Sequence, residues 1–200
     1  MENGGGFFGF MNKLGDMFFL NLVFILTCIP VVTIGPALTA LYTVTLKMAK
    51  GQEGYVVKSY FKAFKDNLKQ GLPVGIVLEI ALFVLIYDAK VLLYSEAVYG
   101  APGFFITIAA VVLIVMMVHY LFPLMARYEN KLSTTILNSI ILAVSKLPTT
   151  ILLVALTAVP VVLVWTWPYM GIYVICIGVV LSAYFQSKLL NKLLDKLENK

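Results

Sequence analysis

Three polar residues within long apolar segments mark the positions where this sequence could do chemistry. Asn21, Glu79 and His119 each lie in a segment that is otherwise almost entirely apolar. Ionisable side chains inside a membrane are energetically costly, and they indicate function by default. Counted from the ends of the expected helices, all three lie roughly 10–12 Å from the same membrane surface. We therefore predict a polar cluster in which Glu79 meets His119, either as a proton or ligand site or as a clamp between helices.

The remaining reactive residues favour a protein that is not an enzyme. His119 is the only histidine, which excludes a HExxH motif and any multi-histidine metal site. Glu79 is the one carboxylate deep in an apolar segment, so a pair of intramembrane acids is missing. Cys28 and Cys176 lie in separate apolar segments and form no metal or redox motif. We expect no catalytic residue, no metal site and no cofactor.

The composition indicates a membrane protein. Hydrophobic residues make up 61% of the 200 residues and charged residues 12%, against roughly 45–50% and 25% in soluble domains. A chain so apolar is not disordered, because disorder requires few apolar residues and many charges. It also has too little polar surface to cover the core of a soluble enzyme. The net charge of +5 is too sparse to indicate binding to nucleic acid.

Long uncharged segments predict an all-α, polytopic transmembrane helical bundle in a single domain, 1–200. One crossing needs about 20 apolar residues. The segments form about six helices in three hairpins, 14–50, 71–126 and 147–187. A five-span alternative stays open, because the second helix, 37–50, is short for a crossing and could be a re-entrant arm buried in protein.

The first hairpin is expected to be broken. The uncharged segment is too long for one upright crossing, and proline and glycine bend or end helices. We predict helices over 14–32 and 37–50, joined by a tight turn at 33–36. The residues of this predicted helix break are Pro30, Thr33, Gly35 and Pro36.

The distribution of basic residues predicts the orientation. With six crossings, Lys90 alone of the 15 Lys and Arg residues lies on the outer side. Basic residues favour the cytoplasmic side of a membrane. The N-terminus and the basic tail, 188–200, are therefore expected in the cytoplasm.

Two inner connectors separate the hairpins. The first, 55–70, predicts an amphipathic helix at the membrane interface, with a stripe of lysines beside a stripe of apolar residues. This stripe either anchors the topology on anionic headgroups or docks a cytoplasmic partner. The second connector, 131–146, is nearly uncharged between its ends and is expected to pack against other helices. The lysines of the first connector are Lys58, Lys62, Lys65 and Lys69, and the neighbouring apolar residues are Val57, Phe61, Phe64 and Leu68.

The segment CIPVVTIGPA at 28–37, continuing as LTALY, is more specific than composition. Together with YFKAFKDN at 60–67 and ARY at 126–128, it resembles the YesL-like family, small integral membrane proteins of Gram-positive bacteria grouped under a domain of unknown function. The resemblance covers nearly the whole chain. It implies a multi-pass protein of the bacterial plasma membrane with an accessory role near oligosaccharide uptake, and it carries no catalytic residues.

Two functions are compatible with these patterns. The first is a non-enzymatic accessory protein of carbohydrate ABC uptake or its sensing, bound to ABC transporter subunits or to a sensor kinase. The alternative is a small self-sufficient membrane carrier that uses Glu79 and His119, working as a homo-oligomer. Few polar residues lie in the spans, which argues against a broad path for sugars and favours the first function.

Overall fold

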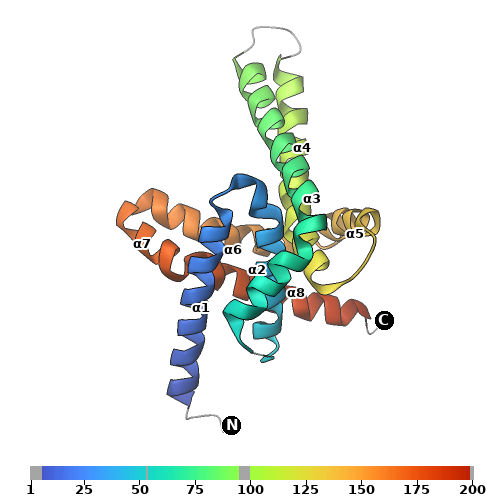
Figure 1. Cartoon of the computed structure of the whole chain (residues 1–200). Helices are drawn as coiled ribbons and strands as arrows, with labels where there is room; N and C mark the ends of the chain where they lie inside the picture. Colours follow the sequence, from blue (N-terminus) through green and yellow to red (C-terminus); the bar gives the residue numbers. More distant parts are fainter. Residues whose placement is uncertain (1–5, 53, 95–99, 199–200) are drawn as a thin grey trace.

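The described residues of the computed structural model, 6–52, 54–94 and 100–198, contain helices and no strand. The predicted all-α helical bundle is thereby confirmed (Figure 1). The long helices are α1 (Gly6–Cys28), α2 (Ile34–Ala49), α3 (Val56–Leu93), α4 (Gly100–Arg127), α5 (Leu132–Ser145), α6 (Leu147–Thr166) and α8 (Val179–Glu198). Shorter elements are η1 (Val31–Thr33), η2 (Pro168–Met170), α7 (Gly171–Tyr173) and the π-helical η3 (Val174–Gly178).

Among the described residues, five helical segments are long and apolar enough to cross a membrane. The second half of α3 is outside this set and carries Glu79, Asp88 and Lys90. It nevertheless runs beside α4 in one hairpin (Figure 1). The number of crossings therefore stays a prediction. The five segments are Phe8–Cys28, Val31–Ala49, Ala101–Arg127, Leu147–Thr166 and Pro168–Glu198.

The break in the first hairpin lies earlier than the sequence suggested. Helix α1 ends at Cys28, and α2 begins at Ile34, so Gly35 and Pro36 belong to the first turn of α2 and not to a connecting turn. Proline is well suited to a first helical turn, because its missing N–H would have no partner there. The Thr33 hydroxyl stabilises the break, since its Oγ1 lies 2.6 Å from the carbonyl oxygens of both Thr27 and Pro30.

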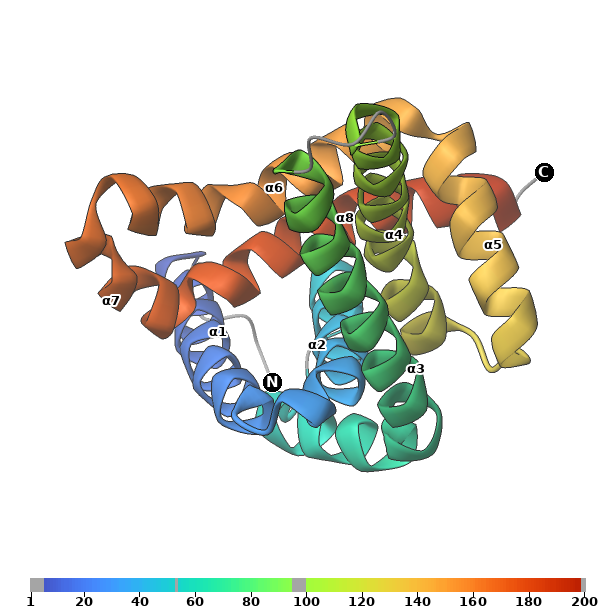
Figure 2. The same ribbon diagram turned by 90° about the horizontal axis from the view of Figure 1, so that it is seen from above.

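The first connector and the third apolar segment form one continuous helix. Instead of ending near Pro73, α3 runs over 38 residues from Val56 to Leu93. Proline removes one backbone N–H and crowds the preceding turn, which bends a helix without ending it where packing supports both sides. The two halves of α3 accordingly run in different directions (Figure 2). The amphipathic first half of α3 is therefore joined to its apolar second half without a flexible loop.

Helix α2 forms the centre of the molecule and meets α3 backbone to backbone. A Cβ atom on Gly35 would lie 2.2 Å from the carbonyl oxygen of Gly71, and one on Gly75 would lie 3.0 Å from the Cα of Gly35. Gly71 and Gly75 have the spacing of a GxxxG motif, which lets two helices approach closely. The same central helix contacts α4 and α8, so this contact positions α3 relative to the whole bundle.

Two apolar hairpins extend from this centre. The α3–α4 hairpin and the hairpin of α6 with α8 point away from the body in different directions (Figures 1 and 2). Their outer surfaces expose large apolar side chains, including Phe83 at 74% and Trp165 at 87% exposure. Apolar surface of this extent is unfavourable in water. Both hairpins therefore have the surface of membrane-embedded helices.

Replacing Gly75 by alanine should loosen the packing of α2 against α3. The added Cβ would lie 3.0 Å from backbone atoms of Gly35, and such overpacking costs about 1–3 kcal/mol. Gly15→Ala is the matched control, because nothing lies within 4 Å of a Cβ added there. Thermal unfolding in detergent should show a clearly lower midpoint for Gly75→Ala alone. Equal midpoints for the two variants would contradict the backbone contact.

Candidate functional site

Asn21 joins α1 to the irregular start of the last helix. Its side chain is fully buried, and its Nδ2 donates to the carbonyl oxygens of Val174 at 3.0 Å and Ile175 at 2.6 Å. Its Oδ1 accepts the backbone N–H of Val180 at 2.9 Å. A π-helix such as η3 displaces backbone groups from their usual helical partners. Asn21 forms hydrogen bonds with three of these backbone groups, so its role is structural.

His119 belongs to a chain of hydrogen bonds that crosses four helices. Its Nε2 lies 2.8 Å from the Thr157 hydroxyl on α6, which also accepts a hydrogen bond from Gln186 Nε2 on α8 at 2.8 Å. The Tyr42 hydroxyl on α2 donates to Gln186 Oε1 at 2.6 Å. Buried polar groups of this kind are stable only when each has a partner. The chain therefore fixes α2, α4, α6 and α8 relative to one another.

The geometry around His119 accommodates both of its protonation states. Nδ1 lies 2.7 Å from the Val115 carbonyl oxygen, which can only accept, so Nδ1 carries a hydrogen. In the neutral ring, Nε2 accepts from the Thr157 hydroxyl. In the charged ring, Nε2 donates, and the Thr157 hydroxyl turns to the Leu153 carbonyl oxygen at 3.1 Å. One hydroxyl rotation thus accommodates a proton on His119.

The predicted contact between Glu79 and His119 is not found among the hydrogen bonds of the described residues. Both ring nitrogens of His119 have other partners, and Glu79 Oε1 is buried without one. Asn21 bonds to η3. The similar depth of the three residues was a poor guide, because depth along a helix does not fix direction around its axis.

Sequence reasoning missed the partners that satisfy His119. Thr157 resembles an ordinary residue of one apolar segment. Gln186 resembles an ordinary residue at the polar end of the next helix. A usable signal was present for Gln186, which lies beside Ser187 at the end of an apolar segment. The GxxxG spacing of Gly71 and Gly75 was also readable from the sequence.

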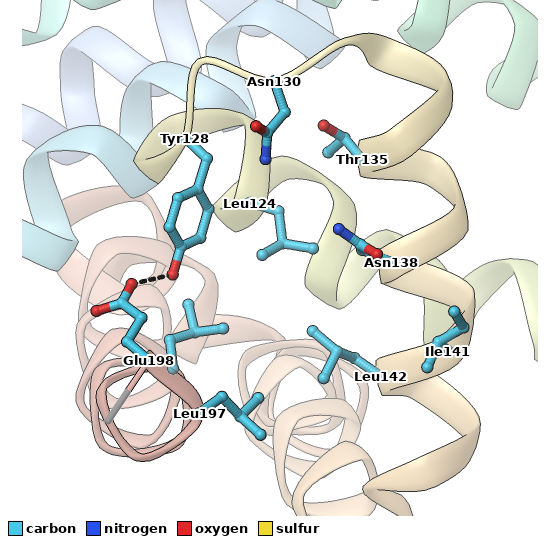
Figure 3. Close-up of a pocket in the computed structure, with 10 residues that line it drawn as sticks. Leu124, Tyr128, Asn130, Thr135, Asn138, Ile141, Leu142, Leu197 and Glu198 are labelled. Carbon is cyan, nitrogen blue, oxygen red and sulfur yellow. Dashed lines mark hydrogen bonds between the residues drawn. The ribbon is translucent and has the colours of Figure 1, made fainter. Parts of the chain in front are cut away.

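The charged ends of α2, α4 and α8 meet in one cluster. Arg127 donates to Asp195 at 2.5 Å and to Glu198 at 2.8 Å, and Lys50 pairs with Asp195 at 2.9 Å. Tyr128 donates to Glu198 beside a cavity of about 330 Å³ between α5 and the end of α8 (Figure 3). The residues that precede the two inner connectors therefore meet the C-terminal tail at this cluster, although the sequence places them far apart.

The first half of α3 presents its lysines outward. Lys58, Lys62, Lys65 and Lys69 are all exposed, and within the described part of the chain none of them has an ion pair. The opposite face is buried at Val56, Tyr60 and Ala63, and the Tyr60 hydroxyl lies 2.6 Å from that of Thr27 on α1.

The apolar residues of this segment divide between two faces. Of the predicted apolar stripe, Val57 and Phe61 are exposed, while Phe64 and Leu68 are half-buried. The buried residues Val56, Tyr60 and Ala63 thus each lie one position before a residue of the predicted apolar stripe. Tyr60 takes an inward position because its hydroxyl finds a partner there.

Comparison with known proteins finds a similar family. Residues 17–89 match the family model described as "Protein of unknown function, DUF624". Over these residues the chain is similar to the DUF624 family. It is also 30% identical over 139 residues to the uncharacterized protein YteU of Bacillus subtilis (strain 168), covering 69% of this chain and 62% of YteU. The chain thus spans less than two thirds of that relative. No solved structure matches it.

The segment that matches the DUF624 model contains the features that organise the N-terminal half of the molecule. Residues 17–89 include Asn21, the helix break, the glycine contact between α2 and α3, and the lysine face. They also include Glu79 but not His119. The family match and the YesL-like resemblance therefore agree on the part of the molecule built around α2 and α3.

Gln186→Leu should destabilise the protein by about 1–3 kcal/mol, because it leaves the buried Tyr42 hydroxyl without a partner. Adding Tyr42→Phe removes that orphaned hydroxyl, so the double variant should be less destabilised than the sum of the two single variants. Unfolding in mixed detergent micelles measures all three. Strictly additive losses would mean that the two side chains are not coupled.

The charged cluster should make the tail sensitive to pH. The hydrogen bond from Arg127, followed by that from Lys50, holds the pKa of Asp195 below its ordinary value. The stabilisation is therefore complete above the ordinary aspartate pKa and is lost as pH falls through the lowered one. Amide hydrogen exchange over 188–198, corrected for intrinsic rates, should show protection falling in that acidic range.

Arg127→Gln should produce the same loss of protection at neutral pH, by about fivefold, since exposed ion pairs contribute about 1 kcal/mol or less. Lys131→Gln removes a nearby charge outside the cluster and should leave the tail unchanged. Equal protection in wild type and Arg127→Gln would show that the cluster does not hold the tail.

Proposed function

We propose that this membrane-like helical protein of unknown biochemical activity is a non-enzymatic accessory protein that docks a partner through the first half of α3. The observation that carries the proposal is the exposed lysine face, whose four ammonium groups have no ion pair among the described residues. A basic face of this kind fits an acidic protein surface or anionic headgroups, at about 1 kcal/mol per lysine near a membrane.

The fixed position of the lysine face supports docking over a simple membrane anchor. Tyr60 and Ala63 are buried against the body, and the bend near Pro73 joins this segment to the close glycine contact with α2. A helix held in this way presents its charges in one arrangement. Preorganised charges lose less entropy on binding than mobile ones.

The YesL-like resemblance suggests the class of partner. We infer subunits of a carbohydrate ABC transporter or a sensor kinase in the bacterial plasma membrane. In this arrangement the lysine face and both termini lie in the cytoplasm, which accords with the preference of basic residues for that side.

The carrier alternative rests on one observation, the buried and unpartnered Oε1 of Glu79. An intramembrane carboxylate without a partner is a candidate proton or ion site. It predicts flux into liposomes by the purified protein alone, which Glu79→Gln would abolish. Against it, other polar side chains of the interior already have hydrogen-bond partners, since His119 and Gln186 both bond to the Thr157 hydroxyl.

Affinity purification from native membranes at chromosomal expression, read by mass spectrometry, tests the accessory function. A stoichiometric transporter subunit or sensor kinase is expected with the wild type. Replacing Lys58, Lys65 and Lys69 by glutamine should reduce its recovery at least fivefold. The matched control replaces three basic residues elsewhere, Lys131, Lys192 and Lys196, and should retain the partner. Self-association alone, or equal losses in both triple variants, would overturn the proposal.

A further inference from the structure

Two cavities open side by side at the charged end of the bundle. The larger, about 670 Å³, lies between the end of α2, the first half of α3 and the end of α4. The smaller, about 180 Å³, lies between α2, α4 and α8. Both cavities are lined by Thr43, Lys47, Ala126 and Arg127. They therefore meet at a pair of cationic side chains.

The basic residues that line these cavities differ in their partners. Four basic residues line them, Lys47, Lys50, Lys62 and Arg127, with two carboxylates, Asp66 and Glu129. Lys50 pairs with Asp195, and Arg127 pairs with both Asp195 and Glu198, although neither of these carboxylates lines a cavity. Lys47 and Lys62 have no ion pair among the described residues.

The two ends of the combined cavity have different chemistry. Lys47 lies where the cavities meet, and it forms no ion pair among the described residues, whereas Arg127 is held by its own carboxylate partners. The larger cavity adds Asp66, Asn67 and Glu129. Cationic donors suit a phosphate, which only accepts hydrogen bonds. Carboxylates and amides suit hydroxyl groups, which both donate and accept.

We propose that this double cavity binds a phosphate ester of a small hydroxyl-rich molecule. The phosphate lies at Lys47 and Arg127, where the cavities meet, and the hydroxyl groups lie against Asp66, Asn67 and Glu129. A phosphate group is anionic at neutral pH and only accepts hydrogen bonds, so it suits the ammonium group of Lys47, which has no ion pair among the described residues. The ligand has two possible sources, a free metabolite or the phosphoglycerol headgroup of an anionic lipid.

Calorimetric titration of the full purified chain, in a polyoxyethylene detergent without sugar groups, tests the site with glycerol 3-phosphate. It should bind at least ten times more tightly than inorganic phosphate or glycerol, because only the ester engages both ends of the cavity. Lys47→Gln should weaken binding at least tenfold and Lys62→Gln at least threefold. Lys131→Gln, outside the lining of both cavities and outside the lysine face, should stay within twofold of wild type.

The same titration in nanodiscs distinguishes the two sources. If binding of glycerol 3-phosphate is weaker in phosphatidylcholine with phosphatidylglycerol than in phosphatidylcholine alone, and Lys47→Gln removes the difference, the site is supported and its ligand is the lipid headgroup. Equal affinity in both membranes supports a free metabolite.

Three results would overturn the site: no binding, binding no tighter than that of inorganic phosphate, or equal losses in Lys47→Gln and Lys131→Gln. Lys62→Gln keeps the test decisive should Lys47→Gln fail to fold. Lys47 is not part of the lysine face, so failure here leaves the docking proposal standing.

Discussion

The close backbone contact between α2 and α3 is the constraint on which the rest of the structure depends. Gly35 faces Gly71 and Gly75 at distances that leave no room for a side chain. Because α2 also contacts α4 and α8, the position of α3 fixes how its lysine face stands relative to the other charged helix ends. The irregular entry to α2 serves this contact, since Pro36 starts the helix where Gly35 must approach α3.

Polar groups inside the bundle support the same arrangement. The chain from Tyr42 through Gln186 and Thr157 to His119 links four helices, and Asn21 holds the π-helical start of the last one. Paired polar groups in an apolar interior specify one packing, because every alternative leaves some of them unpartnered. This interior accounts for stability, and for that reason our proposed binding surfaces lie at the polar end of the bundle.

Composition and periodicity predicted where the apolar helices lie. They did not predict which side chains meet, because that depends on the direction of each side chain around its helix axis. The absence of charges from 17–46 and 147–187 identified apolar helices, and Pro30 lies at the break between α1 and α2. The meeting of Glu79 with His119 could not be judged from depth alone. Pro73 suggested a boundary, yet packing on both sides keeps α3 continuous. The partners of His119 come from α6 and α8, far along the chain, where only tertiary packing brings them near.

The central position of α2 can be tested directly by a disulfide between α2 and α8. The Oγ atoms of Thr45 and Ser187 lie 2.8 Å apart, and both side chains are buried. In native membranes, with Cys28 and Cys176 replaced by serine, cysteines at 45 and 187 should crosslink rapidly on mild oxidation. Cysteines at 43 and 187 should not, because Thr43 lines the cavities at the charged end. No crosslink at 45–187, or an equal yield from both pairs, would contradict a fold organised around α2.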